Sequence, residues 1–352
     1  MDITPFLKLL VQKKGSDLFF TGDAPVKMKI EGVIMSVGKM TLTKQQVESA
    51  VYGIMFDRQR TQLKDDLEVD FAIELEEENA RFRVNIFRQR GSLAMVLRLI
   101  PNQIPSIEDL ELPSIIKQLI MNKRGLILMV GSTGSGKSTT LASMLSYRNH
   151  AAPGHILTIE DPIEYSHPNA KCIINQREIG MDTHSYSAAL RSAMRESPDV
   201  IMIGEIRDRE TMGAALELCN TGHLCVSTMH ANNSNQAIER VINLFPHDHH
   251  KQLLMDLSIN LRAVLSQRLV TGVDTKRLPA VEVLINNPHI TDLILKGDLD
   301  QIKEAMHDSG DGGMQTFDRA LYELYLSDRI DLEEAMSNAD SRTNFEAQIN
   351  FA

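Results

Sequence analysis

Cysteine is scarce in this sequence. The 352 residues include only three cysteines, Cys172, Cys219 and Cys225, and no two of them have CxxC spacing. Because the number is small and odd, a disulfide framework is not expected, and a reducing compartment is favoured. The spacing also excludes a four-cysteine zinc site built from CxxC pairs.

Positive charge is also in short supply. The chain has 37 basic and 47 acidic residues, which gives a formal net charge of -10. Proteins that slide along nucleic acid usually present a basic surface, so the composition argues against nucleic acid as a partner and leaves open only a local basic patch.

Long apolar runs are missing as well. The run at residues 126–130 has five apolar residues before Gly131, whereas a membrane-spanning helix needs about 20. The first residues lack the basic and then apolar pattern of a secretory signal. We therefore expect a cytoplasmic protein that meets a membrane only through partners.

What is present is an ordinary globular composition, with 43% apolar and 24% charged residues. The length predicts two domains. Residues 1–100 read as an α+β domain, with period-two alternation in several segments and a capping-box pattern at Thr43 and Gln46. Pro101, Pro105 and Pro113 mark residues 101–113 as a linker.

After the linker, apolar segments alternate with helical patterns. These segments are residues 126–130, 156–159, 200–203 and 224–228. The alternation predicts an α/β domain with a mostly parallel sheet over residues 114–285. From about Ser234 onward the sequence reads as largely helical, and residues 286–352 are expected to form a C-terminal helical region with a tail.

Residues 131–138 fit the phosphate-loop pattern GxxxxGK[ST], between an apolar strand and a helical stretch. Glycines let backbone N–H groups close around phosphate oxygens, and the helix N-terminus adds positive charge. Lys137 is expected to reach the β- and γ-phosphates and Ser138 to hold Mg²⁺. The alternative is a glycine-rich turn without a ligand. The predicted nucleotide-binding residues of the loop are Gly131, Ser132, Thr133, Gly134, Ser135, Gly136, Lys137, Ser138 and Thr139.

Carboxylates follow two other predicted strands. Residues 200–205 end in Glu205, which is the Walker B pattern with Glu in place of the usual Asp. Residues 156–164 end in Glu160, Asp161 and Glu164. The alternatives are an acidic helix cap and a solvated acidic loop. A third strand leads to His230, and in a parallel sheet these strand ends converge beside the phosphate loop. A lone histidine is otherwise more often structural.

The order of these motifs resembles the secretion-type ATPases of type IV pilus and type II secretion systems. It runs through Walker A (131–138), an "Asp box" (156–164), Walker B (200–205) and a "His box" (221–230). Within that family the chain resembles the retraction ATPases of the PilT/PilU group, and the PilU branch more than the PilT branch. Residues 288–296 keep the apolar positions of a C-terminal helix typical of the PilT branch but lack its two arginines.

The resemblance implies a fold and a set of roles. The fold is a RecA-like P-loop NTPase core, preceded by a smaller PAS-like α+β domain and followed by C-terminal helices. Glu164 is implied as the general base, and Glu205 as the acid that orders Mg²⁺. His223 and His230 would report the phosphate state. Arg191 and Arg195, four residues apart on an expected helix, match phosphate-region arginines of the family, with surface ion pairing as the alternative.

Arg83 and Arg98 lie on neighbouring predicted strands of the first domain. The resemblance implies that they act in trans on the nucleotide of a neighbouring subunit, and hence that the subunits form a ring, a homo-hexamer in this family. Solvated strand arginines are the alternative. The implied partners are a PilT-type ATPase and the inner-membrane pilus platform protein, at the cytoplasmic face of the membrane.

Three functions remain open at this point. The first is an ATP-hydrolysing motor of pilus retraction and twitching motility, accessory to a PilT-type ATPase. The second is a nucleotide-binding ring component that supports a partner motor and hydrolyses little. The third is a nucleic-acid translocase with the same core, against which the net charge and the His box argue.

Overall fold

The computed structural model describes residues 1–309 and 312–351, which divide into two units. The first unit comprises Met1–Gln103 together with Glu164–Ser166, and the second comprises Ile104–Ile163 and the chain from His167 onward. The second unit thus begins inside the proline-marked segment 101–113, where Ile107 and Leu112 are buried in its core.

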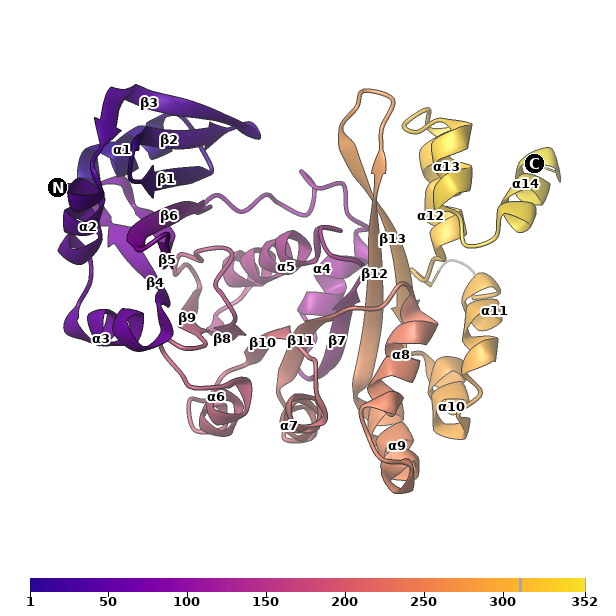
Figure 1. Cartoon of the computed structure of the whole chain (residues 1–352). Helices are drawn as coiled ribbons and strands as arrows, with labels where there is room; N and C mark the ends of the chain where they lie inside the picture. Colours follow the sequence, from indigo (N-terminus) through magenta and orange to yellow (C-terminus); the bar gives the residue numbers. More distant parts are fainter. Residues whose placement is uncertain (310–311, 352) are drawn as a thin grey trace. The chain divides into compact units, whose positions relative to one another are not determined.

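An antiparallel sheet in the order β3-β2-β1-β6-β5-β4 forms the first unit (Figure 1). Three helices, α1 (Thr4–Gln12), α2 (Lys44–Gly53) and α3 (Asp57–Asp66), pack against its strands. The strands are β1 (Asp17–Thr21), β2 (Ala24–Ile30), β3 (Val33–Leu42), β4 (Glu68–Leu75), β5 (Ala80–Gln89) and β6 (Ser92–Ile100), with a 3₁₀ turn η1 (Glu76–Glu78) between β4 and β5. The sequence patterns missed β1 and α3.

Alternation along β5 separates the two faces of this sheet. Phe82 and Val84 are fully buried, whereas Arg81 and Arg83 are only partly covered and lie on the opposite, open face. The predicted capping box at the start of α2 is confirmed, because the Thr43 hydroxyl accepts from the Gln46 N–H (3.2 Å) and the Gln46 side chain accepts from the Thr43 N–H (2.8 Å).

A sheet in the order β13-β12-β7-β11-β10-β8-β9 forms the second unit. All neighbouring pairs are parallel except β12 with β13. The strands are β7 (Gly125–Val130), β8 (Gly154–Glu160), β9 (Cys172–Glu178), β10 (Val200–Glu205), β11 (Leu224–Met229), β12 (Leu261–Thr271) and β13 (Arg277–Ile285).

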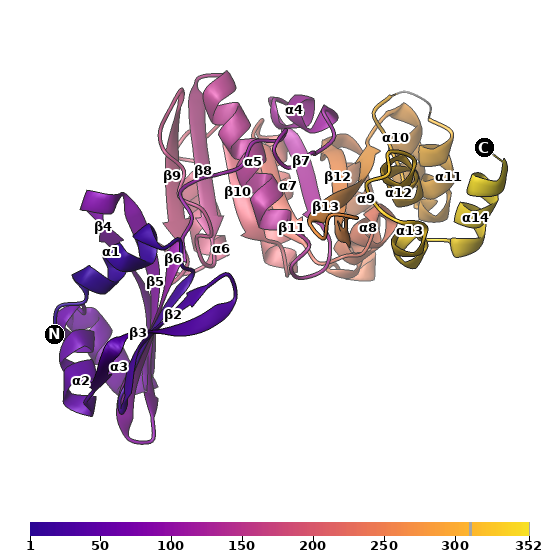
Figure 2. The same ribbon diagram turned by 90° about the horizontal axis from the view of Figure 1, so that it is seen from above.

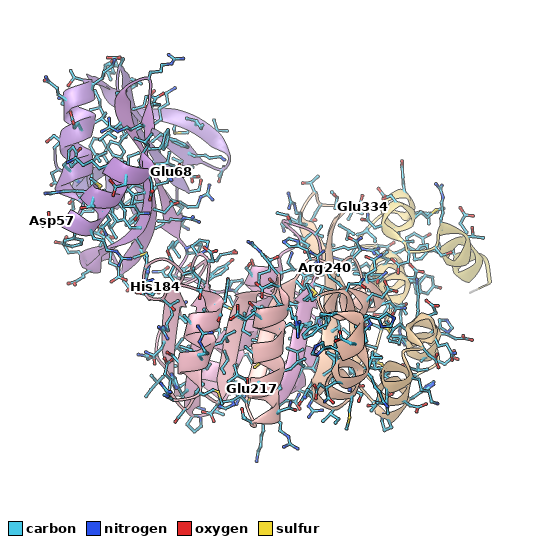
Figure 3. The ribbon with its side chains drawn as sticks, turned by 60° about the horizontal axis from the view of Figure 1, so that its bottom comes forward. Asp57, Glu68, His184, Glu217, Arg240 and Glu334 are labelled. Carbon is cyan, nitrogen blue, oxygen red and sulfur yellow. The ribbon has the colours of Figure 1, made fainter. Side chains whose placement is uncertain are left out.

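Helices cover both faces of this sheet (Figures 1 and 2). Helices α4 (Ile115–Ile120) and α5 (Lys137–Ala151) pack on one face. The other face holds α6 (Tyr186–Ala193), α7 (Arg209–Asn220), α8 (Ser234–Asn243), α9 (His250–Asn260), α10 (Pro288–Lys296) and α11 (Ile302–His307), with 3₁₀ turns η2 (His247–His249) and η3 (Leu299–Gln301). Because both faces are covered, every residue of β7 is buried, which explains its uninterrupted apolar sequence. Side chains fill the space between sheet and helices in each unit (Figure 3).

Helices do make up most of the described chain after Ser234, as expected, but the sequence patterns missed two strands in that region, β12 and β13. Leu, Arg and Gln in these segments favour helix, but pairing of β12 with β7 on one side and β13 on the other overrides that local preference. The turn between them contains Gly272 and Asp274, a hairpin signal that the helical reading passed over.

The far part of the β12–β13 hairpin packs against α12 (Phe317–Leu326), α13 (Leu332–Asn338) and α14 (Arg342–Phe351). Phe317 and Phe345 are fully buried there. The Arg268 guanidinium on β12 lies 3.9 Å from the centroid of the Phe317 ring and donates to the Asn338 carbonyl (2.6 Å) and to Asp340 (2.7 Å). The predicted fold class is confirmed: an α+β unit, a mostly parallel α/β core and C-terminal helices. Residues 310, 311 and 352 of the predicted C-terminal region lie outside the described residues.

Candidate functional site

The phosphate loop joins β7 to α5, as predicted. Gly131 and Gly136 have φ values of +152° and +87°, which side chains rarely adopt. A Cβ added at Gly131 would lie 2.5 Å from the carbonyl oxygen of Gln267, and one at Gly136 would lie 2.7 Å from the Gln267 amide nitrogen. Glycine is therefore required at both positions for conformation and for space.

Lys137 is the first residue of α5, and its side chain folds back onto the start of the phosphate loop. Its ammonium donates to the carbonyls of Gly131 and Ser132, both at 2.9 Å. Ser138 and Thr139 follow in the first turn of the helix, and the N-terminus of a helix favours an anion because its dipole places partial positive charge there. An ammonium held at the loop's mouth can exchange these carbonyls for phosphate oxygens.

Gln267 of β12 supports this loop, and the sequence patterns missed it. Its side-chain amide donates to the Ser135 carbonyl (2.8 Å), and its side-chain oxygen accepts from the Thr140 hydroxyl (2.8 Å). Gln267 is only 3% exposed, so these contacts satisfy a buried polar side chain. No sequence signal identified it, because β12 itself was not predicted.

The carboxyl ends of β7, β11 and β10 lie next to one another, because these strands are adjacent and parallel. The phosphate loop follows β7, His230 follows β11, and Glu205 is the last residue of β10. The predicted convergence of these strand ends is therefore confirmed as a feature of the fold.

Glu205 lies between two cationic or polar neighbours at this edge. Its side chain is 15% exposed and accepts from the Arg207 guanidinium (2.8 Å), and its other oxygen lies 3.2 Å from Nε2 of His230. The hydrogen bond to Glu205 raises the pKa of Arg207. Arg207 is a second residue that sequence reasoning missed, although it stands two positions after the Walker B acid.

Gly204, immediately before Glu205, is closely packed. A Cβ at this position would lie 2.8 Å from the Tyr186 hydroxyl. Burial is the main cause that raises the pKa of Tyr186 above its ordinary range, and the neighbouring Asp161 carboxylate adds to it. Tyr186 therefore remains a neutral hydroxyl beside the carboxylates.

The acids of the Asp box have different surroundings. Glu160 ends β8 and is buried, with its carboxylate accepting from the Thr158 hydroxyl (2.6 Å) and the Gln176 side chain (3.1 Å). Asp161 and Glu164 are exposed. Glu164 belongs, with residues up to Ser166, to the first unit, so the candidate base and the phosphate loop belong to different units of the chain.

The two histidines of the His box lie at opposite ends of β11. His223 precedes the strand, and its carbonyl accepts from the N–H of Gly125 at the start of β7. Its ring contacts the Leu218 carbonyl (3.0 Å) and the Thr221 hydroxyl (3.1 Å). Within this chain the six residues of β11 separate His223 from His230, and a phosphate-reporting role of His223 stays a prediction.

Arg191 and Arg195 do not share a helix face, which corrects the prediction. Helix α6 ends at Ala193, so Arg195 lies beyond it. Arg191 is exposed and pairs with Glu210 at the start of α7 (3.3 Å). Arg191 belongs to the layer of helices on the face opposite α5, and the phosphate role of both arginines stays a prediction.

Arg83 and Arg98 lie directly opposite each other on β5 and β6, on the open face of the first unit's sheet. Nε of Arg98 donates to Asp17 (2.8 Å), and Nε of Arg83 lies 3.7 Å from Asp70. The prediction that these arginines lie on neighbouring strands is thus confirmed, and its implied action in trans stays a prediction.

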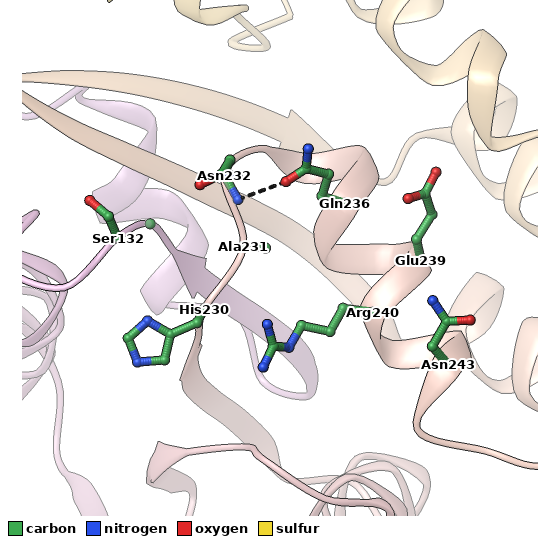
Figure 4. A pocket seen from close by; sticks show the side chains of 9 residues that line it. Ser132, His230, Ala231, Asn232, Gln236, Glu239, Arg240 and Asn243 are labelled. Carbon is green, nitrogen blue, oxygen red and sulfur yellow. Dashed lines mark hydrogen bonds between the residues drawn. The ribbon is translucent and has the colours of Figure 1, made fainter.

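A pocket of about 420 Å³ opens beside the phosphate loop (Figure 4). His230 and Arg240 of α8 both line it, and the Asn232 backbone N–H donates to the Gln236 side chain (3.2 Å). A second hollow of about 340 Å³ borders the other residues of the loop together with Gln267 and Arg268. Together these hollows have the volume of a typical ligand site.

Across residues 1–309 and 312–351, no group of three or more His, Cys, Asp or Glu side chains is placed to hold a metal ion. Ser138 and Glu205 supply a hydroxyl and a carboxylate oxygen, which are donors that Mg²⁺ accepts. Among the described helices, none is long and apolar enough to cross a membrane.

Comparison with known proteins extends these observations. A family model described as type II/IV secretion system protein matches residues 2–321. The chain is 49% identical over 350 residues to the type IV pilus ATPase PilU of Pseudomonas aeruginosa, covering 99% of this chain and 91% of the relative. It is 40% identical to the type IV pilus retraction ATPase PilT of the same organism, covering 98% and 100%. A crystal structure of the pilus retraction motor PilT with bound ADP matches with a TM-score of 0.92, 39% identity and 99% coverage of both chains.

Proposed function

The chain belongs to the type II/IV secretion system protein family, and from that premise we propose that it is an ATP-hydrolysing motor of type IV pilus retraction and twitching motility. It is a P-loop ATPase that works as a PilU-like accessory of a PilT-type ATPase. The observation that carries the proposal is the convergence of the phosphate loop, Glu205 and His230 at one edge of the sheet.

Nucleotide binding follows from the loop. Its backbone N–H groups and Lys137 hold the phosphates, and Gln267 keeps the loop in the required conformation. Ser138 and Glu205 fit Mg²⁺, partly through water, and the metal would neutralise charge on the phosphate oxygens. His230 contacts Glu205 and so connects the phosphate edge to the end of β11.

Glu164 orients the attacking water as the general base. Arg83 and Arg98, on the open face of the first unit's sheet, complete the site of a neighbouring copy. Active sites that need residues from the next chain close most simply as a ring, and we propose a homo-hexamer.

The work of the ring is mechanical. Closure on ATP and reopening on phosphate release shift a partner, the pilus platform protein at the cytoplasmic face of the inner membrane. This lets pilin subunits leave the fibre. Only ATP is changed chemically.

The experiment that tests this proposal is steady-state ATP hydrolysis by the purified full-length chain, alone and titrated with a PilT-type ATPase. Glu164→Gln is expected to lower kcat by about 10²–10⁴-fold, because general-base catalysis contributes that much. Glu217→Gln, on an exposed position of α7 (Figure 3), is the matched control and leaves kcat unchanged.

The outcomes separate the alternatives. Glu164-dependent turnover by the chain alone supports a motor with its own complete sites, and turnover only with the partner supports an accessory motor activated by assembly. Nucleotide binding without Glu164-dependent turnover in either case would overturn the motor and leave a nucleotide-binding ring component.

A further inference from the structure

We propose that Asp17 and Asp70 are positioning residues that hold Arg98 and Arg83 by their Nε atoms, so that the terminal amino groups of both guanidinium groups face outward toward a phosphate ligand. This inference rests on the proposed function, in which the arginine pair reaches the nucleotide of a neighbouring copy.

The sheet register places the four residues together. Across β1, β6 and β5, Asp17 lies opposite Arg98, and Arg98 lies opposite Arg83. Side chains directly opposite in an antiparallel pair have Cβ atoms about 5 Å apart, and like charges there repel each other. Two arginines in this arrangement point apart unless each has its own counter-charge. Asp17 on one side and Asp70 of β4 on the other supply one each.

Asp17 is the stronger of the two holds. Its side chain is only 5% exposed, whereas that of Arg98 is 70% exposed. One carboxylate oxygen accepts from Nε of Arg98 and the other from the Ser16 hydroxyl, both at 2.8 Å. The Asp17 carboxylate is thus fixed by two hydrogen bonds in a buried position, and the exposed Arg98 guanidinium group extends from it into solvent.

The contact geometry leaves the useful end of the guanidinium group free. The hydrogen bond of Arg98 to Asp17 uses Nε alone, and no hydrogen bond to the terminal amino groups of Arg98 exists among residues 1–309 and 312–351. Two parallel N–H donors at that end match the spacing of phosphate oxygens. When Nε is already held and the terminal amino groups are unoccupied, the guanidinium group can bind phosphate with little further loss of side-chain entropy.

Asp70 holds Arg83 in the same manner but more loosely. Nε of Arg83 lies 3.7 Å from Asp70, and the Asn85 side chain donates to the same carboxylate oxygen (3.2 Å). Both side chains are partly exposed, with values of 39% and 54%, so water screens this pair more than the Asp17–Arg98 pair. We therefore expect the larger effect at Asp17.

The test is the ATPase activity of assembled full-length rings carrying Asp17→Asn or Asp70→Asn. Both changes keep the side-chain volume and remove the counter-charge. Since a displacement of about 1 Å in a catalytic group can cost 10²-fold, we expect kcat to fall by about 10- to 100-fold for Asp17→Asn and less for Asp70→Asn, with KM changed less than kcat. Glu74→Gln is the matched control, because Glu74 pairs with Arg81 on the same face (3.4 Å).

A double-mutant cycle separates positioning from a general structural role. Arg98→Lys keeps the charge but has neither the Nε–H that Asp17 holds nor the fork that would meet phosphate, so Asp17→Asn should lower kcat no further in that background. Additive losses of kcat in the double mutant would overturn the inference. So would an Asp17→Asn variant that fails to assemble into rings, as measured by sedimentation, together with wild-type kcat for Asp70→Asn.

The controls also distinguish this inference from the proposed function. Unchanged kcat in Arg83→Ala and Arg98→Ala would remove the role of the arginines in trans, and with it this proposal. Reduced kcat in those variants with unchanged kcat in both aspartate variants would overturn the positioning role alone.

Discussion

At the scale of single residues, Gln267 determines the shape of a loop far from it in sequence. It contacts Ser135 and Thr140 through opposite ends of one amide group. A carboxamide is well suited to this because it donates and accepts at once. Leucine has a similar size but can do neither.

We expect Gln267→Leu to weaken nucleotide binding. The change leaves a buried carbonyl and a buried hydroxyl unsatisfied, which costs about 1–3 kcal/mol. If half of this cost falls on the closed loop, the Kd for ATP rises about two- to tenfold, since each 1.4 kcal/mol is a factor of ten. Titration calorimetry on the purified chain measures the change.

Gln252→Leu is the control for that measurement. Gln252 is exposed on α9, and its side chain donates only to Asp256 (3.2 Å). An unchanged Kd in Gln267→Leu, equal to that of the control, would contradict a supporting role for Gln267.

At the scale of elements, the connection from β8 to β9 carries Glu164 and is anchored by His167. The His167 N–H donates to the Gln176 side chain of β9 (2.8 Å), and the His167 ring is buried. Burial lowers the pKa of His167 to about 4. In an unfolded chain histidine titrates near 6.5.

This difference predicts a dependence of stability on pH. Between about pH 6.5 and pH 4 the unfolded chain binds a proton that the folded chain excludes, so the free energy of unfolding falls as the pH falls through this window. The slope from one such group reaches about 1.4 kcal/mol per pH unit. His167→Gln removes it, and urea unfolding at several pH values should show a flatter profile for this variant.

His184→Gln is the control, because His184 is exposed on the segment before α6 (Figure 3). Profiles for wild type, His167→Gln and His184→Gln that run parallel between pH 4 and 6.5 would contradict the role of the buried ring.

Elements also show how far sequence reasoning extends. Short apolar strands that lead into Gly131, Glu205 and His230 were predictable, because a buried parallel strand is apolar along its whole length and its end is marked by a polar residue. The β12–β13 hairpin was not, since its residues have mixed preferences and only pairing with β7 makes them strands. Because Gln267 lies on β12, its contact with the phosphate loop was not predictable either.

At the scale of the whole molecule, the proposed ring makes a prediction about mixtures. Lys137→Ala chains keep the arginines and lose the phosphate site, and Arg83→Ala/Arg98→Ala chains do the reverse. Each population alone is expected to be inactive. In an equal mixture about a quarter of interfaces join an intact site to intact arginines, because each condition holds for half of the chains. ATPase activity should therefore recover to about that fraction.

Recovery depends on exchange of subunits, so the chains are mixed before assembly and sedimentation confirms that rings form. Wild-type chains mixed with Lys137→Ala chains provide the reference for dilution. Absence of recovery in rings of normal size would contradict the action of the arginines in trans.

The hairpin strand β12 has one more consequence. Gln267 donates a hydrogen bond to the phosphate loop, and the next residue, Arg268, contacts the Phe317 ring and donates to the last residue of α13. Neighbouring residues on a strand share a peptide plane and cannot slide independently. We therefore expect a shift of the phosphate loop on nucleotide binding to move β12 and, through the contacts of Arg268, the helices α12 and α13 as well.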